Sequence, residues 1–261
     1  MSEGELFITI VSLAIVVVHV VMFAIGFSTA EHVRVPWAGR TLLLSLLPAP
    51  LVLMPVLTTI AAKDVRDDPT YVGMYLLMGM AWSALSLFSL RLWGFQLADI
   101  TQRRNPAVRI FIIMFALASA LAFAGGNVGD GPGFHVVIFS ALLGSMTLFG
   151  TLAFLSLTSR VRYRVLVDRD TGLALRTGLL LVAIGLVAGR GAAGTWVSSG
   201  ATVRDFVIVT WPVLPVIALD AAMTTVTRSG DKPPSLLIDA LLGLIYLSLA
   251  CVLVAIWGLP P

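Results

Sequence analysis

The sequence predicts an all-α integral membrane protein with about eight transmembrane helices, and three observations carry that prediction. Of its 261 residues, 58% are hydrophobic and only 12% are charged, whereas soluble domains carry about 25% charged residues. The mean hydropathy is +0.98. The apolar residues gather in runs of about 20 residues, the length that crosses a bilayer core of about 30 Å. This composition excludes disordered, coiled-coil and secreted disulfide-rich chains.

Eight apolar runs separated by polar segments define the expected helices of a single transmembrane domain, residues 1–261. The runs are 6–27, 41–62, 71–98, 107–126, 134–158, 177–200, 206–226 and 236–259. The first run follows an acidic start with Glu3 and Glu5. It is also longer than the apolar part of a typical signal peptide, so we expect it to remain as a helix.

Prolines and small residues mark four of these runs. Prolines remove a backbone donor, so we expect bends in the second run, at Pro48, Pro50 and Pro55, and in the seventh, at Pro212 and Pro215. Small residues let neighbouring helices approach closely. They are Ala116, Ala120 and Ala124 in the fourth run and Gly178, Gly185, Gly189, Ala193 and Gly194 in the sixth. We interpret both sets as intramolecular packing surfaces, with a dimer interface as the alternative.

Basic residues are concentrated in the segments that follow the odd-numbered runs. These residues are Arg34, Arg40, Arg103, Arg104, Arg109, Arg160, Arg162, Arg164, Arg169, Arg176, Arg228 and Lys232. The loops on the other side contain only Lys63, Arg66 and Arg204. Short basic loops stay in the cytoplasm, so we expect both termini on the periplasmic side of a bacterial inner membrane. The net charge of +3 then reflects topology, and nucleic acid is not an expected partner.

The chain could consist of two related four-helix halves, residues 1–126 and 134–261, joined by a glycine-rich outer turn. Residues 82–110 align without gaps over residues 211–239, which pairs Arg91 with Asp220. Halves of four helices each would be parallel repeats. Chance alignment of two apolar segments is the alternative interpretation.

One segment resembles a known family. Residues 97–107 read Leu-Ala-Asp-Ile-Thr-Gln-Arg-Arg-Asn-Pro-Ala and lead into a helix rich in small residues. An acidic, polar helix end followed by an Asn-x-Ala helix start resembles the bacterial YjfL-type membrane family, and residues 168–174 repeat part of the pattern. The resemblance implies a repeated helical membrane domain and no particular activity. This chain differs in having eight expected helices where members usually have four.

The candidate binding residues are the ionisable side chains inside the expected helices, because burying charge in lipid is costly. Arg91 and Asp220 lie near the cytoplasmic ends of their runs, and a direct ion pair between them would offset the cost. The alternative places Arg91 among lipid headgroups and Asp220 in a wet vestibule. The glycines around Arg190 would let another backbone, a lipid headgroup or an anion come close, and the alternative is that its side chain extends outward. We expect Asp239 at the interface, at a helix N-terminus.

No cofactor is expected. His19 is the one histidine deep within a run, so a single axial bond to a tetrapyrrole stays open, whereas His32 and His135 lie at helix ends. Retinal is excluded because both lysines are in loops. The single cysteine, Cys251, allows neither an intrachain disulfide nor a cysteine metal cage.

Catalytic motifs are absent from the sequence, so we do not expect an enzyme. Residues 63–69 (Lys-Asp-Val-Arg-Asp-Asp-Pro) superficially resemble the metal-diphosphate motif of membrane prenyltransferases. A second such motif is missing, and we interpret this segment as a solvated outer turn.

The sequence therefore predicts a polytopic inner-membrane protein that binds or passes a small solute, ion or lipid between its halves. Arg91, Asp220 and Arg190 would be the polar contacts. The alternative is a subunit or scaffold, without a solute path, of a larger membrane complex that could carry pigment or haem. Expected partners are membrane lipids, with other membrane proteins or a second copy of the chain as further candidates.

Overall fold

The computed structural model describes residues 1–28, 44–96, 99, 104–228 and 235–258. All regular structure in these residues is helical, so the expected fold class is confirmed for them. The helices are α1 (Glu3–Ser28), α3 (Pro48–Thr59), α4 (Lys63–Arg66), α5 (Pro69–Ser89), the 3-10 turn η1 (Leu90–Trp93), α7 (Pro106–Gly125), α8 (Phe134–Ser159), α9 (Val161–Leu166), α10 (Thr171–Ala192), α11 (Ser199–Thr210), α12 (Val213–Thr227) and α13 (Leu236–Trp257).

Six described helices are long and apolar enough to cross a membrane: α1, α5 with η1, α7, α8, α10 and α13. A seventh span would be the pair α11 and α12, which bend by 46° where they meet. This bend confirms the expected effect of Pro212, which lies at the break. The second expected run is represented by α3, a 12-residue helix with Pro48 in its first turn and Pro55 inside. It is shorter than a full span, and the count of eight stays a prediction.

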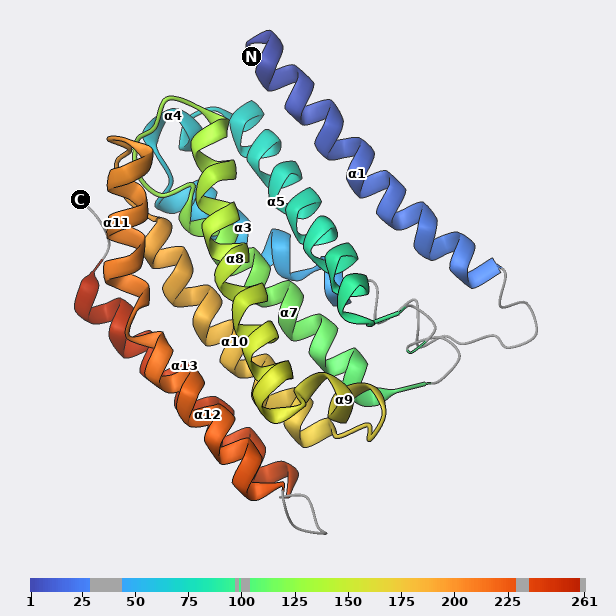
Figure 1. Ribbon diagram of the computed structural model, residues 1–261. Helices are drawn as coiled ribbons and strands as arrows, with labels where there is room; N and C mark the ends of the chain where they lie inside the picture. Colours follow the sequence, from blue (N-terminus) through green and yellow to red (C-terminus); the bar gives the residue numbers. More distant parts are fainter. Residues whose placement is uncertain (29–43, 97–98, 100–103, 229–234, 259–261) are drawn as a thin grey trace.

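Helix α10 is central to the bundle, and most of its residues are buried. It packs mainly against α7 and α13, with α8 and α11 also in contact. Helix α1 lies at the edge of the bundle away from α13 and packs mainly against α5. Most apolar residues of α1 are therefore exposed. Figure 1 shows α1 and α13 as the two flanks of a layered helical bundle.

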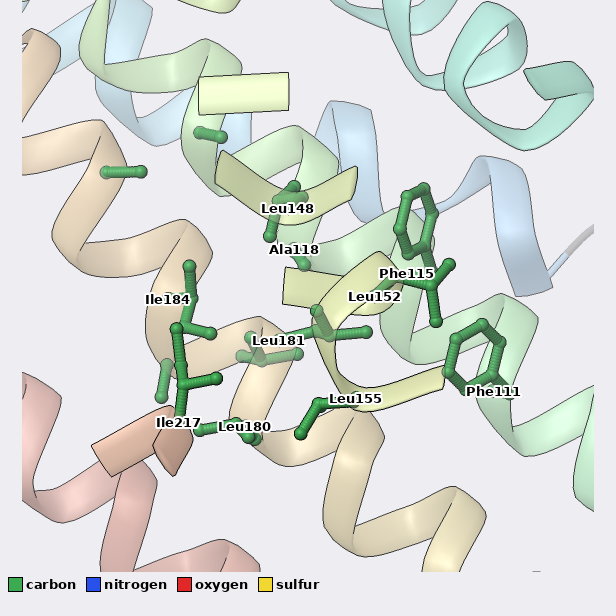
Figure 2. Packing of buried hydrophobic residues seen from close by; sticks show 14 of the residues in the cluster. Phe111, Phe115, Ala118, Leu148, Leu152, Leu155, Leu180, Leu181, Ile184 and Ile217 are labelled. Atoms are coloured by element: carbon green, nitrogen blue, oxygen red, sulfur yellow. The ribbon is translucent and has the colours of Figure 1, made fainter. Parts of the chain in front are cut away.

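The largest apolar core forms where α7, α8, α10 and α12 meet. Phe111 and Phe115 of α7 and Leu152 of α8 are fully buried there, facing Leu181 and Ile184 of α10. Figure 2 shows these side chains interdigitating between the helices. A second core joins α3, α5 and the far half of α7. The first core holds α10 in a fixed position, which determines where its polar residues lie.

Glycines of α10 allow it to touch the backbone of α7. A methyl group added at Gly185 would collide with the carbonyl oxygen of Ala118, and one at Gly189 would collide with that of Leu121. Both contacts lie within one chain. The intramolecular interpretation of this small-residue surface is therefore confirmed.

The bundle has two different ends. At the arginine-rich end, which we define by residues 160–170, α8 ends and α10 begins. At the far end, α1 begins, α13 ends and the α7–α8 turn lies beside the α10–α11 connection. Two backbone hydrogen bonds join these connections, from Gly194 N–H to Val128 (2.7 Å) and from Trp196 N–H to Asp130 (2.8 Å). The start of α1 and the end of α13 thus lie at the same end of the bundle.

Candidate functional site

The first turn of α10 places the residue on which the site is built. Asp170 caps the helix, its side chain accepting a hydrogen bond from Leu173 N–H at 2.8 Å. The helix therefore begins at Thr171, before the expected start at residue 177. The interpretation of Arg176 as a loop residue is wrong, because this early start puts it in the second helical turn, where its side chain is fully buried.

Arg176 binds groups from two other helices. Its Nε lies 2.9 Å from Oδ1 of Asp220 on α12, and its Nη1 donates to Oδ1 of Asp239 on α13 at 3.2 Å. Its Nη2 donates to the hydroxyl of Thr224 on α12. The planar guanidinium thus donates hydrogen bonds to Asp239 and Thr224 and forms an ion pair with Asp220, a geometry that a lysine ammonium could not reproduce.

A second arginine extends the cluster towards the arginine-rich end. Arg228 directly follows α12, and its Nε donates to Oδ2 of Asp170 at 2.7 Å. Its Nη2 donates to Oδ2 of Asp239, also at 2.7 Å. Asp239 therefore bridges the two arginines. We call Asp170, Arg176, Asp220, Arg228 and Asp239 the charge network.

The network runs from the rim of the bundle into its interior. The Asp170 side chain keeps 14% of its surface exposed, whereas the side chains of Arg176, Asp220 and Asp239 are at 0%. At 1.5 Å per residue, Asp220 lies about 10 Å inside the end of α12. There the hydroxyl of Tyr246, on α13, donates to its Oδ1 at 3.0 Å.

Gly172, in the first turn of α10, has no side chain and so leaves room for the carboxylate of Asp239. A methyl group added at Gly172 would collide with Oδ2 of Asp239. At the rim, burial acts to raise the pKa of Asp170. The hydrogen bonds from Arg228 and Leu173 outweigh it and leave that pKa below its ordinary value of 3.8. Asp170 is thus held as a carboxylate at neutral pH.

The expected pair of Arg91 and Asp220 does not form. Arg91 lies in η1, where α5 has ended, and it is exposed, with its guanidinium carbon 4.8 Å from the centre of the Phe88 ring. This position agrees with the alternative in which Arg91 reaches outward. Asp220 is fully buried against Arg176, so the wet vestibule is also wrong. Asp239 is buried as well, and the expected interfacial position is corrected.

Arg190 contacts another backbone, one of the contacts that the glycines around it allow. It lies in the last turn of α10 and donates from Nε to the carbonyl oxygen of Gly258 and from Nη2 to that of Trp257, the latter at 3.1 Å. These carbonyls end α13, where the helix dipole favours a cation. Arg190 thus fastens the end of α13 to α10.

Replacing Arg190 with methionine is expected to loosen the last turn of α13 and to cost about 1 kcal/mol, because the lost charge-assisted bonds are partly exposed to solvent. Amide hydrogen exchange over residues 251–258 should speed up, while Arg190→Lys should retain part of the protection. Unchanged exchange together with lost binding of an anion would instead support the sequence-based binding role.

His19, on α1, is 8% exposed. It lies close enough to Arg91 for the two side chains to interact electrostatically. His135 occupies the first turn of α8 at the far end, whereas His19 lies about 24 Å along α1 from that end. His32 is outside the described residues. The described part of the chain thus offers no pair of histidines at matched depth, and single ligation by His19 stays untested.

The acidic segment 63–69 forms α4 and the cap of α5. Asp64 and Asp67 are exposed, and Asp68 accepts a hydrogen bond from Thr70 N–H at 2.7 Å. The interpretation as a solvated turn is confirmed. No group of three or more histidine, cysteine, aspartate or glutamate side chains in the described residues could hold a metal ion.

The bend between α11 and α12 borders a cavity of about 570 Å³. Gly150 and Phe154 of α8 line one wall, and Trp211 and Ile217 line the other, so its surface is mainly apolar. Its volume is within the range of ligand sites in proteins. The cavity lies beside the helix that carries Asp220.

Comparisons with protein-family models, curated proteins and solved structures find no match. The assignment of residues to the site therefore rests on the distances and burial described above. Sequence reasoning selected Asp220 and missed Asp170, Arg176 and Arg228. One signal for them was available: Asp170 followed by Thr171, Gly172 and apolar residues is typical of a helix N-cap, and it would have placed Arg176 inside the helix.

Proposed function

We propose that the protein is a polytopic inner-membrane protein that binds and passes a small ion or solute, with the charge network as its polar site. One observation carries the proposal: three carboxylates and two guanidiniums are buried together between α10, α12 and α13. Ionisable groups within membrane helices are costly and commonly mark ion or substrate pathways.

The interrupted helix supports the same proposal. Asp220 lies on α12, directly after the 46° break, and interrupted helices commonly form the binding sites of transporters. The neighbouring apolar cavity could hold the apolar part of a solute or a lipid chain. Site and cavity together provide polar and apolar surfaces along one bent element, the α11–α12 pair.

The finer topology belongs to the same proposal. We infer eight spans, with the arginine-rich end in the cytoplasm. Both termini would then be periplasmic. The duplication into halves 1–126 and 134–261 and the YjfL-type resemblance also remain our proposals.

The alternative function, a scaffold subunit of a membrane complex, draws on the exposed apolar face of α1. Leu6, Phe7, Ile10 and Val17 on that face are each about half or more exposed. Lipid chains would cover such a face without any protein partner. The charge network therefore favours passage of a solute or ion over a scaffold role.

Reconstitution into liposomes tests the proposal. Wild-type protein should carry at least one of three probes, protons, alkali cations or small organic anions, across the bilayer under an imposed potential. Asp220→Asn, which preserves side-chain shape, should reduce that flux at least tenfold. The control is Asp205→Asn, because Asp205 is an exposed carboxylate on the adjoining helix α11, and it should retain the flux. Equal flux in both variants would contradict the assignment of the site.

A further inference from the structure

Two fully buried carboxylates of the charge network share one guanidinium. Asp220 and Asp239 both lie against Arg176, whereas Asp170, at the rim, is paired with Arg228 and also interacts electrostatically with Arg164. The inner part of the network is enclosed by apolar helices, where an incompletely paired charge costs several kcal/mol. Binding one positive ion, or one proton, beside Asp220 would lower that cost.

Hydrogen bonding distinguishes Asp220 from the other two carboxylates. Each oxygen of Asp239 accepts from a different arginine, and each oxygen of Asp170 accepts from Arg228. Asp220 uses only Oδ1, which faces both Arg176 and Tyr246. Its Oδ2 is buried and has no hydrogen-bond partner among the described residues. Asp220 is therefore the carboxylate that loses least by becoming neutral.

A proton suits this position better than a metal ion. Hard cations bind about six or more oxygen ligands, whereas the free position at Asp220 offers one carboxylate oxygen. The nearby guanidinium of Arg176 would also repel a metal cation. A proton needs one oxygen and leaves the contacts of Oδ1 in place.

The surroundings of Asp220 contain few other groups that could accept this proton. Helix α10 contributes Arg176 and its capping residue Asp170, and α12 contributes Arg228. Helix α13 contributes Asp239 and Tyr246. Helix α9 carries Arg162, Tyr163 and Arg164, of which Arg164 donates to the backbone carbonyl of Arg228 at 3.2 Å, and α8 carries only His135, in its first turn at the far end.

We propose that Asp220 is a reversible proton-binding site, and that H⁺ is the ion bound or coupled by this protein. The proton bonds to Oδ2 and converts the carboxylate to a carboxylic acid, with no other bond formed or broken. The proton removes one of the two carboxylate charges that share Arg176. Its loss returns that negative charge to the junction of α10, α12 and α13. This inference deepens the proposed function and rests on it for its role in transport.

Infrared spectroscopy of the reconstituted protein tests the proton directly, because a buried carboxylic acid has a carbonyl stretch that a carboxylate lacks. Wild-type protein at neutral pH should show this band, and Asp220→Asn should remove it at every pH. The control Asp205→Asn should keep it. A folded wild-type protein without the band, or a band that survives Asp220→Asn, would overturn the proposal.

A second variant keeps the carboxyl group of Asp220 but removes its reason to bind a proton. Asp239→Asn removes the carboxylate that shares Arg176 with Asp220, so Asp220 is then fully paired with that guanidinium and has no reason to hold a proton. Its band should be absent at neutral pH and return in acid. A band unchanged by Asp239→Asn would contradict the charge argument.

The infrared result does not depend on transport. A band that requires Asp220 in a protein that carries none of the probes would uphold the proton site and reject the proposed passage. Flux that requires Asp220 without the band would uphold passage and reject the proton.

Discussion

Replacing Arg176 with methionine is expected to lower the free energy of unfolding by about 3–5 kcal/mol, the cost of removing one partner from a buried ion cluster. Methionine fills similar space without charge. It leaves Asp220 and Asp239 buried with only Arg228 nearby, and it removes the donor to Thr224. Thermal and denaturant unfolding in detergent micelles would measure the loss, with size-exclusion chromatography reporting whether the variant still folds.

Three further variants test whether the loss of stability is specific to the contacts of Arg176. Arg204→Met removes an exposed arginine from α11 and should change stability by less than about 0.5 kcal/mol. Arg176→Lys keeps the charge but loses the fork geometry, so its loss should be intermediate. The double variant Arg176→Met with Asp239→Asn restores the formal charge of the network and should recover part of the stability. If the single methionine variant unfolds like wild type, the network does not stabilise the fold.

The sequence alone predicts the helical class and much of the pattern of spans, because the length of an apolar run depends only on neighbouring residues. Runs 107–126 and 134–158 correspond closely to α7 and α8. Pro212 predicted the position of the bend, because the missing backbone N–H of a proline weakens the helix at the proline itself. Helix α3 shows the limit of this reasoning: it ends at Thr59, whereas composition alone extends the apolar run to residue 62.

The site was less accessible to sequence reasoning, because its contacts join distant positions. Asp220 was identifiable as an acid within an apolar run, but nothing local selects Arg176 over Arg91 as its partner. That choice depends on α10 packing beside α12 and α13, and on a helix start set by Asp170. Arg190 shows the same dependence, since its partners are the carbonyls that end another helix.

Replacing Gly185 with leucine is expected to disrupt the α7–α10 contact on which the site depends. The new side chain would meet the carbonyl oxygen of Ala118, and backbone cannot move aside as a flexible side chain can. Overpacking of protein cores costs about 1–3 kcal/mol, occasionally more, and we expect a loss at or above the upper end of that range. Gly185→Ala should give a smaller loss in the same direction.

A glycine in open surroundings provides the matched control for Gly185. Gly150 lies inside α8, where an added methyl group would meet no atom within 4 Å, so Gly150→Leu should be tolerated and Gly150→Ala should gain up to about 1 kcal/mol from helix propensity. Melting temperature and monodispersity in detergent distinguish the pair. If Gly185→Leu kept its melting temperature but lost a co-purifying second copy, Gly185 would belong to a dimer interface instead. Loss of stability in the monomer would tie this glycine surface to the placement of Arg176, because α10 carries both.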